Sequence, residues 1–437
     1  MTPPSETVSP STLDLSYVRS QFPSLTRTVK GHPAVFFDGP GGTQVPTRVM
    51  DAISNYLSHD NANTGGAYAT SRYTDRMIAE ARAAMADFLD CGADEVIFGP
   101  NMTSLTFAMS RAIGRELGPG DEIVVTRLDH DANVSPWIAM AEDRGVTVRW
   151  AGIHNHNCTL DIADLASKIN ENTKLVAVGY ASNAVGTINP VKAIVKLAHG
   201  AGALAYVDAV HYGPHGMIDV AALNCDFLAC STYKFFGPHM GVLYGKREHL
   251  TRLRPYKVRP NTNAIPNCWE WGTLNHECIA GITACVEYIA DLGRTCRASL
   301  DGQASRVAPP VPTRRRAIEA AYAAIHEHER VLVERLMTGL EEIPGLKIYG
   351  ITDRARLHER CPTFAVRIEG HTPLELATQL GERGFFTWDG NYYALNLTEH
   401  LDVEKSGGFL RIGLVHYNTA EEVDRFLVTL GEIAGAQ

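Results

Sequence analysis

The sequence contains no long apolar run, no closely paired cysteines and no excess of basic charge. No hydrophobic stretch approaches the roughly 20 residues that a membrane-spanning helix needs, so no membrane association is expected. Its 49 acidic residues outnumber its 40 lysines and arginines, and a net charge of -9 argues against a nucleic acid as partner. The nine cysteines include no CxxC pair, so we expect reduced thiols rather than a disulfide framework.

The first 25 residues lack the basic and apolar regions of a secretory signal, and they are too acidic and too poor in arginine for a transit peptide. We therefore expect a cytoplasmic protein whose residues 1–30 form an N-terminal arm that becomes ordered around Leu13. His154, His156 and Cys158 lie close together in the sequence, but further ligands at a suitable spacing are missing. The sequence therefore predicts no metal site.

Short apolar, β-branched runs alternate with amphipathic segments from Met50 to about Tyr244. The runs occupy residues 95–98, 122–125, 146–150, 175–178, 204–207 and 227–229, and helices are expected at 75–89 and 191–199. This alternation predicts an α/β fold with a mostly parallel sheet and helices on both faces. Ligands of such sheets bind at the carboxyl ends of the strands, so functional residues should directly follow the apolar runs.

The composition changes at residues 294–316, which we interpret as a linker or surface loop. A long helix is expected at 317–340, strands at 346–349 and 363–367, and a last helix from about Thr419. We therefore expect a large domain over residues 31–293 and a smaller α+β domain over residues 294–437.

The most informative motif follows the apolar run at 227–229, where Ser231, Tyr233 and Lys234 precede a Gly-Pro turn and a returning strand. A lysine at such a strand end has low-dielectric walls around it, which lower the pKa of the amine and make it a nucleophile. Taken alone, the same lysine is equally well a solvated loop residue.

The preceding run ends in Asp208, which is either a helix cap or a carboxylate that pairs with a protonated pyridine nitrogen. His130 follows the run at 122–125, and Asn183 follows the run at 175–178. Both are structural residues or ligands of a cofactor ring. The segment with Met102 and Thr103 lies between a strand and a helix, where backbone N–H groups bind phosphate.

In their order along the chain, these motifs resemble those of fold-type I enzymes that use pyridoxal 5'-phosphate. The resemblance is to the class V aminotransferases, in the cysteine desulfurase-like branch that includes isopenicillin N epimerase relatives, and it extends from about Phe36 to Thr419. It implies a mostly parallel seven-stranded sheet in a large domain, with a smaller α+β C-terminal domain.

The resemblance also implies a role for each matching residue. Lys234 would be the Schiff-base lysine and Asp208 the partner of the pyridine nitrogen, while His130 would stack over the cofactor ring. The other cofactor-binding positions are Met102, Thr103, Asn183, His211, Ser231 and Tyr233. Thr273 matches a phosphate ligand donated by the partner subunit, which implies a homodimer, and Arg411 matches the arginine that binds the substrate carboxylate.

Residues 387–394 depart from the family pattern. Tyr393 stands where desulfurases have the cysteine that accepts sulfur, and Trp388 replaces a second arginine. The last cysteine is Cys361, so a desulfurase mechanism requires Cys361 or Cys268 to reach the site. Asn391 of this loop and Tyr68 of a Gly-rich segment are further candidates for contact with a small amino-acid substrate.

We therefore expect an enzyme that removes the Cα proton of an amino acid or amino-acid conjugate, with β-elimination by a C–S lyase ranked first. Transamination, epimerisation and carbon–carbon bond formation stay open, as does a cysteine desulfurase that yields alanine and a persulfide. A non-catalytic partner or scaffold is the alternative of a different class, and Lys234, Asp208 and Arg411 together argue against it.

Overall fold

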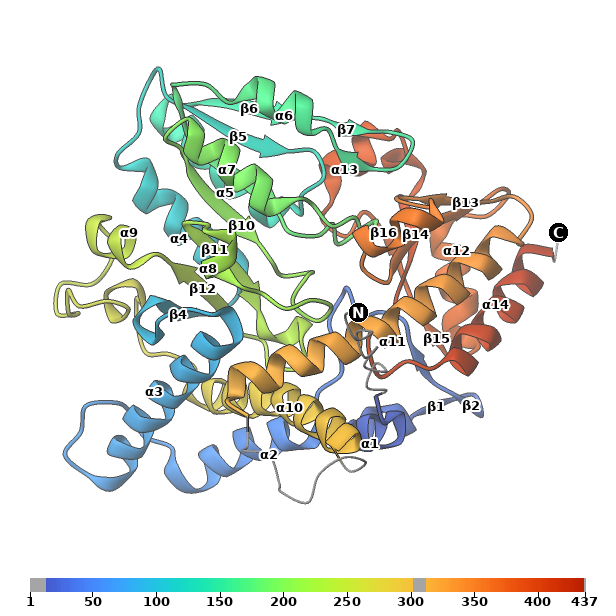
Figure 1. The fold of residues 1–437 in the computed structure, drawn as a ribbon, viewed down its shortest axis with the longest axis horizontal. Coiled ribbons are helices and arrows are strands. Elements are labelled where there is room, and N and C mark those ends of the chain that lie inside the picture. Colours follow the sequence, from blue (N-terminus) through green and yellow to red (C-terminus); the bar gives the residue numbers. More distant parts are fainter. Residues whose placement is uncertain (1–12, 302–311, 436–437) are drawn as a thin grey trace, which may run out of the picture.

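The computed structural model describes residues 13–301 and 312–435 (Figure 1). The first twelve residues of the expected N-terminal arm lie outside this range. From Leu13 onward the chain is folded: helix α1 (Leu15–Ser20) follows, and Phe22 is buried between the rings of Phe236, Tyr288 and Tyr417. This part of the expected arm therefore belongs to the packed body of the protein.

A seven-stranded sheet forms the centre of the large domain, and it confirms the predicted fold class. Its strands, in spatial order, are β4 (Val96–Gly99), β12 (Gly241–Gly245), β11 (Phe227–Ser231), β10 (Leu204–Asp208), β9 (Thr173–Gly179), β5 (Glu122–Thr126) and β6 (Thr147–Ala151). Strand β12 runs antiparallel to both neighbours, and the other pairs are parallel. Each apolar run of the sequence therefore became a strand of this sheet.

Alternate residues of each strand face two different apolar cores. Val176 and Val178 of β9 join the core under α3 (Ala69–Leu89), α7 (Val191–Gly200) and α10 (His276–Asp301). Leu175 and Ala177 join the opposite core, which α4 (Met102–Gly114) and α5 (Ser135–Arg144) cover. Because both faces are buried, the central strands are mostly apolar, as parallel strands usually are, whereas the edge strand β6 has exposed Thr147 and Arg149.

Shorter elements complete the large domain. They are the helices α2 (Thr47–Asn55), α6 (Ile162–Lys168), α8 (Val220–Leu223) and α9 (Arg247–Arg252), with the hairpins β1 (Thr28–Val29) with β2 (His32–Pro33) and β7 (Ile153–His154) with β8 (Thr159–Leu160).

The C-terminal domain has an antiparallel sheet of four strands, coloured orange to red in Figure 1. The order is β13 (Leu346–Tyr349), β14 (Thr363–Ile368), β17 (Phe409–Gly413) and β16 (Trp388–Gly390). Its core contains residues of α11 (Arg314–Glu341), α12 (Pro373–Glu382) and α14 (Ala420–Gly435), and α13 (Leu395–His400) lies in the loop between β16 and β17. The long helix, the two strands and the last helix expected in this part of the chain are confirmed.

The expected linker at 294–316 is wrong at both ends. Helix α10 continues to Asp301 and α11 already begins at Arg314, while residues 302–311 lie outside the described range. The Thr313 side chain caps α11 by accepting the N–H of Arg316, and the side chain of Arg314 forms ion pairs with Glu80, Asp87 and Glu287. None of the helices in the described ranges combines the length and apolarity needed to cross a bilayer.

The segment around β3 (Val35–Phe36) joins the large domain to the C-terminal domain. Strand β3 pairs in parallel with β15 (Phe385–Phe386), and Asp38 forms an isolated bridge with Gly413 at the end of β17. The segment that follows β3 is therefore held between the C-terminal sheet and the large domain.

A buried ion pair fixes the segment after α9 to the large sheet. Both guanidinium Nη atoms of Arg82 donate to the carboxylate of Glu270, at 2.7 and 2.8 Å, and the N–H of Phe98 in β4 donates to the same carboxylate at 2.9 Å. Removal of one partner leaves the other charge buried and unpaired.

We expect Arg82→Ala to lower the free energy of unfolding by about 3–5 kcal/mol, because the buried Glu270 carboxylate loses its cation. Urea unfolding followed by far-UV circular dichroism measures this loss. The control is Arg335→Ala, which removes the half-exposed pair with Asp424 and should cost far less. Equal losses for the two variants would contradict a structural role for the buried pair.

Candidate active site

A cavity of about 750 Å³ opens at the carboxyl ends of the parallel strands, between the two domains. All the predicted site residues except Tyr68, Thr273 and Asn391 line it. Strand order explains the convergence, because Asp208 ends β10 and Ser231 ends the neighbouring strand β11. The folded sheet therefore brings together residues that are up to 309 positions apart, from Met102 to Arg411.

Lys234 lies at the end of the 3-10 turn η5 (Thr232–Lys234) and points under the loop that follows β3. Its Nζ donates to the carbonyl oxygens of Pro40 and Gly41, the latter at 3.1 Å. Burial, together with the smaller effect of the Arg411 charge, lowers the pKa of this amine from 10.5 to about 7. A substantial fraction of the amine is therefore neutral, and nucleophilic, at neutral pH.

Asp208 is buried at the floor of the cavity. One carboxylate oxygen accepts the N–H of Val210 at 2.9 Å. Burial raises the pKa of the carboxyl group to about 7, and the nearby carboxyl group of Asp129 adds to this shift. A cation placed against Asp208 would therefore favour its charged form.

The turn between β4 and α4 forms a cradle of polar groups with the end of β11. Asn101 caps α4, and the N–H of Met102 donates to the Ser231 hydroxyl at 3.2 Å. The backbones approach this closely because residue 241 is glycine: a Cβ there would lie 2.3 Å from the Asn101 carbonyl carbon. A helix N-terminus followed by the Thr103 hydroxyl is suited to bind a phosphate group.

His130 and Tyr393 stack against each other on the side of the C-terminal domain, with ring centroids 5.5 Å apart. The Nδ1 atom of His130 accepts the N–H of Ala132 at 3.0 Å, so the neutral ring carries its proton on Nε2. Burial lowers the pKa of His130 to about 4, which keeps the ring neutral at pH 7. His130 is therefore placed to stack or to donate through Nε2–H, and not to act as a cation.

Arg411 on β17 is buried, and none of the described carboxylates forms an ion pair with it. Its Nη1 donates to the Asn183 carbonyl at 3.0 Å, its guanidinium lies over the Tyr392 ring, and its Nε has no partner. Burial lowers the pKa of Arg411 to about 10, so it stays charged at neutral pH. A buried cation with free donors is suited to bind a carboxylate.

The loop after β16 is held in a strained shape over the cavity. Tyr392 and Tyr393 have φ angles of 55° and 61°, in the region that non-glycine residues rarely adopt. The Asn183 amide donates to the Tyr392 carbonyl at 2.8 Å, and the N–H of Asp131 donates to the Tyr393 carbonyl at 2.7 Å. Such strain persists only where its surroundings hold it in place, which is typical of functional loops.

His211 lies in the wall of the cavity, with its Nε2 3.1 Å from the Thr363 hydroxyl of β14. Burial lowers the pKa of His211 well below its usual value. The neutral ring has one donor nitrogen and one acceptor nitrogen, so it offers hydrogen-bonding groups to both domains.

Three predicted residues lie outside the cavity lining. The Asn391 amide is used within its own loop, where it donates to Glu404 and accepts the N–H of Tyr393. Tyr68 and Thr273 are exposed and line no part of this chain's cavity.

The structure places two further residues at the site, Asp38 and His239, and sequence reasoning had assigned no role to His239. Burial raises the pKa of Asp38 to about 6, and its carboxyl group interacts with the charges of Arg411 and Lys234. His239 lines the cavity and stacks on Tyr233, with ring centroids 4.8 Å apart. The Gly-Pro turn before His239 was the available signal, because it returns the chain to the site directly after Lys234.

The residues present fit pyridoxal 5'-phosphate. A neutral buried amine, a buried carboxylate for a ring nitrogen and a helix N-terminus for a phosphate converge on one cavity. The buried Oδ1 of Asn183 has no partner, as expected of a group that a ligand satisfies. Fold and site therefore define a fold-type I enzyme that uses this cofactor.

Comparisons with known proteins agree with this class. The chain is 31% identical over 433 residues to the aminotransferase-like protein FGM3 of Gibberella zeae, covering 97% of this chain and 99% of that protein. It is 32% identical over 427 residues to a probable cysteine desulfurase of Halalkalibacterium halodurans, covering 93% and 95%. The apo cysteine desulfurase of Thermococcus onnurineus superimposes with a TM-score of 0.84 at 26% identity, covering 98% and 100%.

The aminotransferase class-V family model matches residues 35–306 and 316–426, so the chain belongs to this family. The cofactor and the family expected from the motifs are thereby confirmed, and the protein is a pyridoxal-phosphate-dependent enzyme.

We expect Lys234 to be the lysine that captures the cofactor. Because only the neutral amine reacts, the rate at which Lys234 binds the cofactor covalently should rise about tenfold per pH unit up to pH 7 and level off above it. Borohydride reduction after short incubations at different pH values, with mass spectrometry of the labelled peptide, measures this profile.

Lys234→Ala should lose the borohydride-stable label, whereas the half-exposed Lys174→Ala should keep it. A label on another lysine, or a rate that still rises up to pH 10, would overturn the assignment.

Proposed function

We propose that this enzyme cleaves the carbon–sulfur bond of a cysteine-derived amino acid by β-elimination. The observation that carries the proposal is that none of the nine cysteines, all of which lie in the described ranges, lines the cavity. A desulfurase needs a thiolate that attacks the substrate sulfur, and Tyr393 occupies that side of this cavity. An elimination requires no thiol on the protein.

Arg411 would bind the substrate carboxylate. Its guanidinium is buried at the cavity, and its Nε–H has no hydrogen-bond partner. A carboxylate that binds in a bidentate pair would accept this hydrogen bond and neutralise the positive charge. This contact fixes the substrate at one end and orients its Cα–H bond toward Lys234.

Lys234 would remove the Cα proton. An amine with a pKa near 7 accepts a proton at neutral pH and also releases it readily. When bound, pyridoxal phosphate supplies the electron sink that makes this proton acidic, and the Asp208 carboxylate stabilises positive charge on the ring. The sulfur substituent then leaves from Cβ as a thiolate. The three-carbon enamine that remains is hydrolysed to pyruvate and ammonia.

The mouth of the cavity supports a substrate with a substituent on sulfur. Trp388 and Tyr393 line it and are 51% and 72% exposed, so an aromatic rim faces solvent beside the site. A free cysteine side chain would not reach this rim, whereas an S-conjugate extends along it.

A homodimer forms part of the proposal. Thr273 is exposed and lies outside this chain's own cavity lining, which supports a role in the partner's cavity. Light scattering during size-exclusion chromatography measures the mass, and Thr273→Ala should weaken cofactor binding without any change in mass.

Product analysis tests the reaction. Incubation of the enzyme with S-substituted cysteines should give pyruvate and ammonia in equal amounts, with no alanine. Alanine together with a persulfide on the protein would instead establish a cysteine desulfurase, and a keto acid that keeps its sulfur would establish a transaminase.

We expect Arg411→Ala to weaken substrate binding by about 2–3 kcal/mol, because a charge-assisted bidentate pair is lost. Substrate titration followed by the visible cofactor band measures this change. Arg411→Lys should recover part of the loss, and Arg367→Ala, on neighbouring β14, serves as the control. Unchanged binding in Arg411→Ala would remove the carboxylate role.

A further inference from the structure

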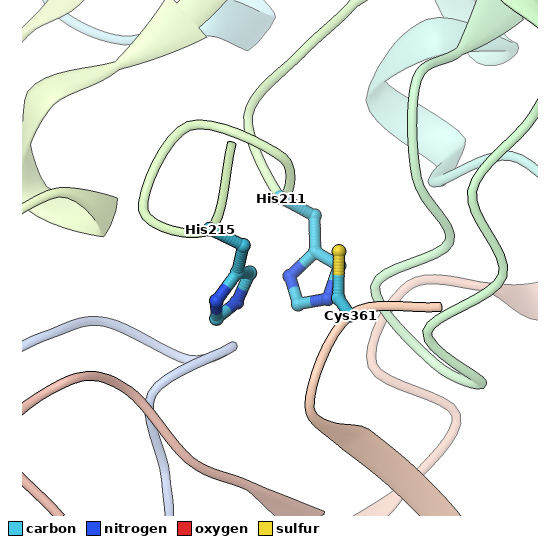
Figure 2. Close-up of side chains that lie close together, drawn as sticks. All are labelled: His211, His215 and Cys361. Carbon is cyan, nitrogen blue, oxygen red and sulfur yellow. The ribbon is translucent and has the colours of Figure 1, made fainter. Parts of the chain in front are cut away.

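Three side chains with metal-binding atoms meet behind the wall of the cofactor cavity: His211, His215 and Cys361 (Figure 2). One nitrogen from each histidine and the sulfur lie within 4.8 Å of one another, and all three residues are buried. The histidines come from the loop after β10, and Cys361 comes from the segment before β14. The cluster therefore joins the large domain to the C-terminal domain.

His215 is oriented as a metal ligand would be. Its Nδ1 lies 3.0 and 3.1 Å from the two carboxylate oxygens of the buried Glu329, so Nδ1 carries the proton and Nε2 the lone pair. That Nε2 is buried and has no hydrogen-bond partner. A carboxylate that holds the outer nitrogen of a histidine is the usual second layer of a metal site, and here the inner nitrogen has nothing to bind.

His211 offers a second lone pair. Donation from its Nε2–H to the Thr363 hydroxyl, 3.1 Å away, leaves the lone pair on the other ring nitrogen. Figure 2 shows a nitrogen of the His211 ring on the side that faces His215. The two rings are neighbours, with centroids 5.4 Å apart.

Cys361 supplies the sulfur, and one positive charge lies near it. The adjacent Arg360 is buried, and its guanidinium donates to the carbonyl oxygens of Ile351 and Thr363 rather than to a carboxylate. Burial raises the pKa of the Cys361 thiol, but a bound metal ion deprotonates a thiol that coordinates it. The proton passes to solvent when the metal binds.

We propose that His211, His215 and Cys361 bind a zinc ion, with Glu329 as the residue that positions His215. Two imidazoles and one thiolate form a ligand set that zinc prefers, and a water molecule completes the tetrahedron. Zinc–ligand bonds of about 2.0–2.3 Å require the three atoms to close in by about 1 Å from their present spacing. The charges of the thiolate and of Glu329 balance the two charges of the ion.

Such an ion would tie the two domains together directly beside the cofactor. His211 lines the cofactor cavity as well, so occupancy of the metal site would fix the ring that the cofactor meets. The inference does not depend on which reaction the enzyme catalyses.

Metal content tests the proposal on the cofactor-loaded enzyme. After incubation with Zn²⁺ and gel filtration, we expect inductively coupled plasma mass spectrometry to find close to one zinc per chain. Zinc-edge X-ray absorption of the wild type should show one sulfur scatterer at about 2.3 Å. Substitution by Co²⁺ should give the visible bands of a tetrahedral site with thiolate coordination.

Cys361→Ser should lose both the zinc and the thiolate band of cobalt, and Glu329→Gln should weaken zinc binding by about 10–100-fold while all three ligands are kept. The control is Cys268→Ser, which replaces another buried cysteine and should retain the zinc. Zinc no higher in the wild type than in Cys361→Ser, or an absorption spectrum without sulfur, would overturn the proposal.

Discussion

The site depends on one constraint: an amine and a carboxylate at one edge of the large sheet, and a guanidinium on the C-terminal sheet, are kept out of water in the same cavity. Burial is the main cause that moves the pKa of Lys234 down and that of Asp208 up, until both lie near 7. The parallel pairing of β10 with β11 brings the ends of both strands, Asp208 and Ser231, to the same edge of the sheet, and the Lys234 amine donates to the backbone carbonyls of residues 40 and 41. Charged groups held this way exchange protons at neutral pH, which they could not do on the surface.

The sequence predicted the parts of the site that follow directly from strands. Each apolar run became a strand, so Asp208, Lys234, His130 and Asn183 had to meet at one edge. It could not predict details set by tertiary packing, such as the hydrogen bonds from Lys234 to the carbonyl oxygens of Pro40 and Gly41 or the left-handed conformation of Tyr392 and Tyr393. Nor could composition reveal that α10 extends to Asp301 or that α11 begins at Arg314, which forms ion pairs with acids far away in the sequence.

The C-terminal domain completes the site. Arg411 brings a buried positive charge, and the strained loop places Tyr393 against His130 rather than a thiol against the substrate. The same domain brings Cys361 to two histidines of the large domain, although 146 residues separate Cys361 from His215. No spacing rule connects such residues, which is why the sequence predicted no metal. Both features lie at the junction of the two domains, where the cavity also lies.

The most direct test of the account is exchange of the Cα hydrogen in D₂O. L-Alanine has no group to eliminate, so proton NMR follows the deprotonation step alone. The account predicts that the cofactor-loaded enzyme replaces the Cα proton of L-alanine with deuterium and that Lys234→Ala, supplied with the same cofactor, does not. The account would be contradicted if the cofactor is bound at Lys234 but the Cα proton is exchanged neither in L-alanine nor in S-substituted cysteines.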